Sequence, residues 1–196
     1  MPRRVSAPVF ETRQVPLRWV EDRAHYDVVL RALTEAQHSV WIATANLKDV
    51  RLEAPIGSVA RAQRRFISIT EYFAGLLAKR VELRVLLATT PSGPFRASLA
   101  RRPSLPPPSK WLRQCPRVHL KLLVVDGAEL YLGSANLTGA GLGAKADARR
   151  NFELGVTTTD HVLIDAAQRR FDRIWTGTEC KGCQIRRQCP APLDQL

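Results

Sequence analysis

The chain has 196 residues, which suffices for one globular domain with a hydrophobic core. Lys and Arg outnumber Asp and Glu by 30 to 18, and the net charge of +12 favours an anionic partner, nucleic acid before an anionic membrane surface. No apolar run is long enough to cross a bilayer, and the basic first residues lack the apolar stretch of a signal peptide. We therefore expect a cytoplasmic and prokaryotic protein.

Helical and strand-like patterns alternate along the chain. Apolar side chains recur at helical spacing in three segments, residues 23–37, 60–79 and 160–175. The last of these helices is expected to begin at Asp160 as its N-cap. Runs typical of strands cover residues 39–47, 81–89, 118–125, 129–135 and 152–158. Strands separated by helices in so short a chain predict an α/β fold, a sheet covered by helices on both faces.

Two stretches read as basic loops beside the strands of residues 118–135. RRPSLPPPSK (101–110) has too many prolines for regular structure, and GAGLGAKADARR (139–150) is rich in small residues. Loops on a rigid sheet commonly carry binding groups, although a solvated linker would have the same composition. The expected phosphate contacts in and around these loops are Arg101, Arg102, Lys110, Arg113, Arg149 and Arg150.

The segment VHLKLLVVDGAELYLGSANLTG (118–139) carries polar side chains in an otherwise apolar hairpin. Side chains alternate along a strand, so His119 and Lys121 share one face, as do Ser134 and Asn136. Asp126-Gly127 is a strong turn signal. With either Asp126-Gly127 or Gly127-Ala128 as the central loop residues, all four side chains meet on one face. A loop one residue longer would scatter them.

Such a cluster suits a phosphate. An ammonium supplies charge, an amide and a hydroxyl supply hydrogen bonds, and an imidazole attacks or transfers a proton. Gly133 would let a substrate approach the backbone. The alternative is a core strand whose His and Lys are capped by neighbours, which is disfavoured because burying four polar groups without a ligand is costly. Asp126 points the other way and is expected to stabilise the turn.

At these residues the sequence resembles the phospholipase D superfamily, whose motif is H-x-K-x4-D-x6-G-S-x-N. His119, Lys121, Asp126, Gly133, Ser134 and Asn136 fill every motif position, and Asn151 to Glu153 fits the family's downstream N-x-E. The resemblance implies a mixed sheet flanked by helices on both faces, with one motif copy per chain. We expect a catalytic domain over residues 1–176 and a Cys-rich tail over 177–196 packed on it.

The resemblance also implies a mechanism that needs no metal. A histidine attacks the phosphorus of a phosphodiester, and a second histidine protonates the leaving alcohol. Here His119 would be the nucleophile or acid, Lys121 and Asn136 would bind phosphoryl oxygens, Ser134 would support them, and Glu153 would orient an imidazole. The segment ATANLKDV (43–50) is similar to SANLTGAG of the motif, but no H-x-K precedes it, and we interpret it as a core strand and its turn rather than a second copy. One copy per chain therefore implies a C2 homodimer.

The four cysteines are Cys115, Cys180, Cys183 and Cys189, the last three as C-x2-C-x5-C. Three cysteines in ten residues of a cytosolic chain favour a metal site over disulfides. The pattern resembles the C-terminal iron–sulfur staple of certain CRISPR adaptation nucleases and helicase-nucleases, which implies a structural [4Fe–4S] cluster. Structural zinc is the alternative. Either would tie the tail to the strand that carries His119.

The leading hypothesis is therefore a nucleic-acid phosphodiesterase, with DNA favoured as substrate and a protein partner that would confer specificity. Two alternatives stay open. The same chemistry serves a phospholipid phosphodiesterase acting on a cardiolipin-type lipid. The chain could also bind nucleic acid without cleaving it.

Overall fold

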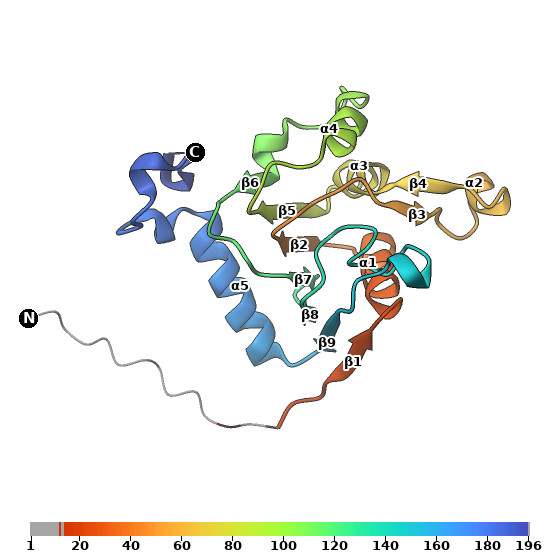
Figure 1. Ribbon diagram of the computed structural model, residues 1–196, viewed down its shortest axis with the longest axis horizontal. Helices are drawn as coiled ribbons and strands as arrows, with labels where there is room; N and C mark the ends of the chain where they lie inside the picture. Colours follow the sequence, from red (N-terminus) through yellow and green to blue (C-terminus); the bar gives the residue numbers. More distant parts are fainter. Residues whose placement is uncertain (1–11, 13, 196) are drawn as a thin grey trace, which may run out of the picture.

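A mixed sheet of seven strands, in the order β1-β9-β8-β7-β2-β5-β6, organises the protein (Figure 1). In chain order its strands are β1 (Arg18–Glu21), β2 (Ser39–Thr44), β5 (Glu82–Leu87), β6 (Leu112–Gln114), β7 (Leu122–Val125), β8 (Glu129–Gly133) and β9 (Leu154–Thr158). Strands β2, β5 and β6 are parallel, and every other neighbouring pair is antiparallel. The computed structural model describes residues 12 and 14–195, so the basic segment 1–11 lies outside the described residues.

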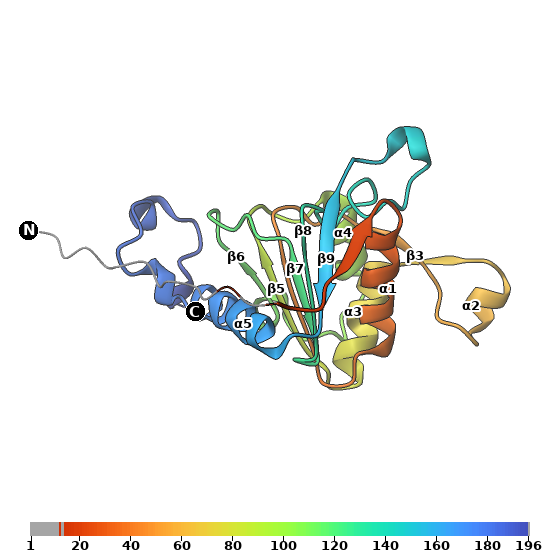
Figure 2. The ribbon, with the colours of Figure 1, turned by 90° about the horizontal axis from the view of Figure 1, so that it is seen from below.

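Helices cover both faces of the sheet, as expected (Figure 2). On one face lie α1 (Ala24–Glu35), α3 (Ile69–Ala78) and α4 (Gly93–Ala100). Their core includes Phe73, whose ring meets Phe95 and Trp111 edge-on, with centroids 6.2 and 5.9 Å apart. On the other face α5 (His161–Trp175) packs Phe171 against Trp41 of β2, with the two ring centroids 5.2 Å apart.

The sequence pattern explains α5 well. Asp160 caps it, accepting a hydrogen bond from the Leu163 N–H at 2.9 Å. Ile164, Phe171 and Ile174 recur at helical spacing and are buried in the second core. The helix ends before Gly177, whose φ of +76° suits glycine. The residues that follow form short 3₁₀ turns, Thr178–Cys180, Arg186–Gln188 and Leu193–Gln195.

The helix predicted over residues 60–79 is wrong in its first half. Residues Val59–Ala62 form only a short helix, α2, and the chain then reverses at Arg64, which has a φ of +53°. β4 (Phe66–Ser68) pairs with β3 (Arg51–Glu53), and the helix proper starts at Ile69, with the Ser68 hydroxyl as its cap. Residues 51–68, which we call the arm, project away from the sheet (Figure 2).

Other elements carried too weak a signal in the sequence. The short strands β1, β3 and β6 and the helix α4 were not predicted. Conversely, residues 118–121, predicted as the start of a strand, precede β7 without regular structure. In the described part of the chain, no helix has the length and apolar character that spanning a membrane requires.

Asp126 occupies the corner of the β7–β8 hairpin. Its φ is +53° and that of Gly127 is +62°, and the Ala128 N–H donates to the Val125 carbonyl at 2.9 Å, which closes the turn. Its carboxylate accepts hydrogen bonds from three backbone N–H groups of the segment before β2, those of residues 37, 38 and 39, at 2.9, 2.7 and 2.8 Å. Burial alone would raise the pKa of Asp126, but these donors outweigh it and lower that pKa.

We expect Asp126→Asn to destabilise the protein at neutral pH by about 1–2 kcal/mol, because hydrogen bonds to a charged acceptor are lost while asparagine tolerates the positive φ. A carboxylate whose pKa is lowered by folding stabilises the protein above the ordinary Asp pKa, and this contribution is lost as the pH falls through the folded pKa. Urea unfolding of both proteins from neutral to acidic pH measures it. A stability difference that stays constant over that range contradicts the assignment.

Candidate active site

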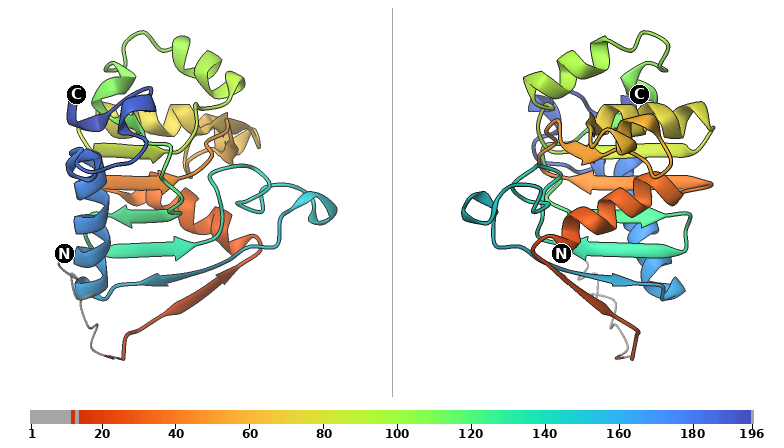
Figure 3. Two further views of the ribbon diagram at one scale, coloured as in Figure 1. Left: turned by 60° about the vertical axis from the view of Figure 1, so that its left-hand side comes forward. Right: turned by 90° about the vertical axis from the view of Figure 1, so that its right-hand side faces the viewer.

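The polar residues of the hairpin segment lie at one edge of the sheet. β2, β5 and β8 end at this edge, while β7 and β9 begin there, and the loops that extend from it are seen at the right of the left-hand view in Figure 3. The Asp126 turn lies at the opposite edge. The site is therefore built where strands give way to loops, the usual place for binding groups in an α/β sheet.

The register of the hairpin differs from both registers expected from the sequence. Val125 pairs with Glu129 and Leu122 with Leu132, so continuing this register brings Ala135 opposite His119. The cause is one extra residue, Ala128, between the closed turn and the first pair of β8. Simple alternation would separate His119 and Lys121 from Ser134 and Asn136. These residues lie outside the two strands, because the first pair precedes β7 and the second pair follows β8. Side-chain hydrogen bonds therefore fix their placement.

His119 and Lys121 form a pair at the start of the hairpin. The Lys121 Nζ lies 3.1 Å from the His119 Nε2 and 3.2 Å from its Nδ1, and it donates to the His119 carbonyl at 3.0 Å. The imidazole is exposed, as a nucleophile must be. Burial lowers the pKa of Lys121, and the nearby Glu153 carboxylate opposes this shift. The pair thus presents an imidazole and a cation side by side.

Ser134 and Glu153 form a second group. The Ser134 hydroxyl donates to the Glu153 Oε2 and accepts from the Leu154 N–H at 3.0 Å. Asn151, the first residue of the N-x-E pattern, donates to the Glu153 Oε1 at 3.0 Å. Both carboxylate oxygens are therefore occupied, and within the described residues no hydrogen bond joins Glu153 to His119. The Gly133 N–H donates to the Lys121 carbonyl at 3.1 Å, which places Ser134 and its partners next to the first group.

Asn136 is held by the segment that follows β2. Its Oδ1 accepts from the backbone N–H groups of Ala45 and Asn46, at 3.1 and 3.2 Å, and from the Thr44 hydroxyl at 3.3 Å. Thr44 in turn accepts from the Leu137 N–H at 3.0 Å. With its oxygen bound, the amide must direct its NH₂ group elsewhere, and within the described residues that group has no protein acceptor. Asn136 is thus fixed as a donor.

The sequence echo between ATANL and SANL has a structural meaning that sequence reasoning missed. Leu47 and Leu137 form a parallel bridge, and the Lys48 N–H donates to the Leu137 carbonyl at 3.1 Å. The two similar segments lie side by side, and one positions the catalytic-motif asparagine of the other. The repeated pattern was the available signal.

Gly133 serves a different purpose from the one expected. A Cβ at this position would strike the Tyr131 hydroxyl and come within 2.9 Å of the Leu154 carbonyl. Gly155 faces the same ring, since a Cβ there would lie 2.7 Å from Tyr131 Cε2. Tyr131 is buried and its hydroxyl lies 2.8 Å from the His25 Nδ1. Gly133 therefore makes room for a core tyrosine, and the approach of a substrate to its backbone stays a prediction.

The six predicted basic contacts are not brought together. Arg101 is exposed at the end of α4. Lys110 is exposed just before β6, which lies four strand spacings from β8, or roughly 20 Å. Arg102 is bound to Glu71 at 3.1 Å. Arg149 is exposed beyond β8. Arg150 is paired with Asp147.

Arg113 is used inside the protein. Its guanidinium lies 4.5 Å from the Trp175 ring centroid and donates to the Trp175 carbonyl. Burial, and then Arg84, lower its pKa. The arm instead carries three exposed arginines that were not singled out, Arg51, Arg64 and Arg65.

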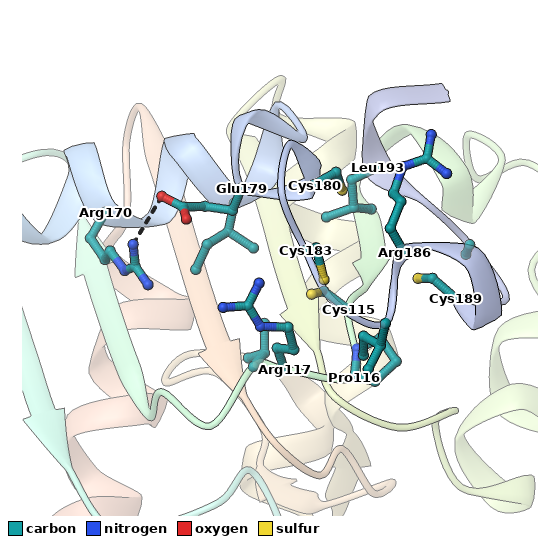
Figure 4. A pocket seen from close by; sticks show the side chains of 14 residues that line it. Cys115, Pro116, Arg117, Arg170, Glu179, Cys180, Cys183, Arg186, Cys189 and Leu193 are labelled. Carbon is teal, nitrogen blue, oxygen red and sulfur yellow. Dashed lines mark hydrogen bonds and ion pairs between the residues drawn. The ribbon is translucent and has the colours of Figure 1, made fainter. Parts of the chain in front are cut away.

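The four cysteines gather beside α5 on the β6 side of the sheet, with Cys115 directly after the carboxyl end of β6, and none of them forms a disulfide (Figure 4). The Arg117 guanidinium lowers the pKa of Cys183, while burial raises the pKa of Cys115. Over the residues that the structure describes, no three His, Cys, Asp or Glu side chains are already arranged to hold a metal ion.

The comparisons with known proteins agree with this architecture. A family model described as "Cardiolipin synthase, PLD-like domain" matches residues 29–175. No match was found among curated proteins. NucT from Helicobacter pylori is similar with a TM-score of 0.57 at 12% identity, covering 82% of this chain and 95% of its own.

Two further structures share the fold. Nuc from Salmonella typhimurium, a phospholipase D family member, gives a TM-score of 0.56 at 16% identity over 83% of this chain and 95% of its own. The archaeal chromatin protein TrmBL2 gives a TM-score of 0.50 at 17% identity, over 88% of this chain and 55% of its own. Fold, motif and a family model that spans most of the sequence agree, and the chain belongs to the phospholipase D superfamily, as a protein with a PLD-like domain.

Proposed function

We propose that the protein is a phosphodiesterase that cleaves nucleic acid, DNA by preference, through a phosphohistidine intermediate at His119. The observation that carries the proposal is the exposed imidazole beside the Lys121 ammonium, at an edge where Asn136 offers a free NH₂ group. These are a nucleophile, a charge and a donor for one phosphate.

The chemistry follows from these groups. The neutral imidazole of His119 attacks the phosphorus, and the bond from phosphorus to the leaving oxygen breaks. That oxygen takes a proton from a second histidine, which then accepts a proton from water as the water attacks the phosphohistidine. The phosphorus–nitrogen bond breaks in this second step, which releases the product phosphate and restores the His119 imidazole. Lys121 and Asn136 donate to the phosphoryl oxygens as their charge grows. We propose that the reaction needs no metal, because protein groups supply the nucleophile, the proton and the charge.

The second histidine is proposed to come from a second copy of the chain in a C2 homodimer. Apolar side chains are exposed next to the site residues on the β8–β9 side, with Leu132 at 39%, Leu154 at 52% and Phe152 at 102% exposure. Phe152 and Leu154 directly flank Glu153 in sequence, and Leu132 lies two residues before Ser134. Exposed apolar surface of this kind is typical of an interface, and covering it with a second chain would bring two copies of the site together.

Charge supports nucleic acid as the substrate. The net charge of +12 favours a polyanion, and the exposed arginines of the arm and of the loop after β8 offer phosphate contacts. The DNA binding named for TrmBL2 shows that one protein of this fold engages DNA. The four cysteines of this chain form no disulfide, which fits the reducing cytoplasm, where we propose that the protein acts.

A phospholipid phosphodiesterase is the second candidate function. The matching family model is named for cardiolipin synthase, and the exposed Leu132, Phe152 and Leu154 could meet lipid as well as protein. Binding of nucleic acid without turnover is the third. Hydrolysis of cardiolipin vesicles and cleavage of labelled DNA, measured on one preparation, separate the three.

We expect His119→Ala to lower DNA cleavage by more than about 10³-fold, because the nucleophile is lost. Activity should persist in EDTA. His161→Ala is the matched control, since His161 is an exposed histidine at the start of α5, away from the site. Single-stranded DNA, double-stranded DNA and RNA should be assayed in parallel. Full activity of the His119 variant, or a requirement for a divalent metal, would overturn the mechanism.

Mixed dimers test the shared site. If each site needs two His119 side chains, equal amounts of wild-type and His119→Ala chains refolded together should retain about one quarter of the activity, against about one half if each chain acts alone. Analytical ultracentrifugation should show a dimer. A monomer that cleaves DNA rules out the proposed assembly.

A further inference from the structure

All four cysteines line one cavity of about 70 Å³ beneath the C-terminal tail (Figure 4). Cys115 comes from the loop after β6, Cys180 ends the first 3₁₀ turn after α5, Cys183 lies between the first two of these turns, and Cys189 directly follows the second. The rest of the wall is mainly apolar, with Val118, Ile174 and Leu193. Residues far apart in sequence thus converge on one enclosed space, and the convergence includes every cysteine of the chain.

Little else in the backbone holds the tail in place. Its internal hydrogen bonds are local turns, such as Cys180 N–H to the Gly177 carbonyl at 2.8 Å and Cys183 N–H to the Cys180 carbonyl at 3.1 Å. Leu193 is buried in the second core, and Arg186 pairs with Asp194 at 3.0 Å. A segment with few long-range bonds that places three thiols against a fourth is typical of a segment fixed by a cross-link.

We propose that Cys115, Cys180, Cys183 and Cys189 are the thiolate ligands of one metal centre, a [4Fe–4S] cluster. A single zinc ion needs its four sulfurs within about 2.3 Å of one point. All four side chains border the same cavity. Four thiolates are the ligand set of a [4Fe–4S] cluster, and the C-x2-C-x5-C tail with a distant fourth cysteine differs from the paired C-x2-C knuckles of zinc ribbons.

Charge at the cavity fits the same occupant. Four thiolates around a cluster carry net negative charge, and binding releases the thiol protons. Arg117, Arg170 and Arg186 line the cavity together with Glu179. Arg170 pairs with Glu179 and Arg186 with Asp194, whereas Arg117, two residues after Cys115, brings a further positive charge to the thiolates.

The centre would also stiffen the approach to the catalytic motif. The Val118 N–H donates to the Cys115 carbonyl at 2.9 Å, and the Val118 side chain is buried in the second core. His119 follows directly. Cluster binding would therefore join the tail, the core beneath α5 and the segment that carries His119 into one unit.

Protein purified without oxygen tests the proposal, and its metal content does not depend on whether the proposed activity is correct. We expect brown protein with equal amounts of iron and acid-labile sulfide, and a broad visible absorbance that is bleached by dithionite. Colourless protein with stoichiometric zinc would overturn the cluster while keeping the four-thiolate site. Protein free of metal after iron–sulfur reconstitution would overturn both.

Cys189→Ser and Gln188→Ser form a matched pair of variants. Gln188 is exposed, does not line the cavity and is the neighbour of Cys189. The cysteine variant should lose iron, unfold at a lower temperature and expose the tail to limited proteolysis, whereas the glutamine variant should match the wild type. Equal iron content in the two variants would show that Cys189 is not a ligand and would contradict the proposal.

Discussion

The hairpin that carries the motif residues is fastened to β2 at both of its ends. At one end the Asp126 carboxylate binds the backbone just before β2, and at the other the Asn136 amide binds the backbone just after it. Between them β7 pairs with β2 from Ala43 to Val40. Because β2 also pairs with β5, these two motif residues fix the site relative to the whole sheet.

This fastening gives the motif residues two different kinds of role. Asp126 and Asn136 both hold backbone, but Asn136 also keeps an unbound NH₂ group at the functional edge. His119 and Lys121 are bound mainly to each other and stay accessible. A rigid support with a few exposed groups is the arrangement expected for a site whose geometry must persist while a substrate enters and leaves.

The sequence was sufficient for the parts of the protein in which local pattern and packing agree. The long apolar strands, α5 with its Asp160 cap, and the spacing of the motif all led to the right architecture. The hairpin register was not predictable, because Ala128 changes it without leaving a mark in the hydrophobic pattern. The first half of the predicted helix over residues 60–79 failed because Arg64 adopts a positive φ, which arginine rarely does.

Arginine placement was equally beyond sequence reasoning. In the sequence Arg113 resembled the basic residues of the nearby loop. Its guanidinium instead donates a hydrogen bond to the Trp175 carbonyl, 62 residues away along the chain. By contrast, the cysteines could be grouped from their spacing, since few functions other than metal binding require three of them in ten residues. Long-range contacts such as that between Arg113 and Trp175 set the role of a charged residue, and they are visible only in the folded chain.

The Tyr131 ring covers Gly133 on its own strand and Gly155 on the neighbouring strand, and it occupies the space that a side chain at either position would need. Gly133 and Gly155 have to stay small for as long as residue 131 is large. A smaller residue at 131 would in turn leave His25 without its buried hydroxyl partner. These positions should therefore vary together among relatives of this chain, so that one glycine of the motif is constrained by the core rather than by the reaction.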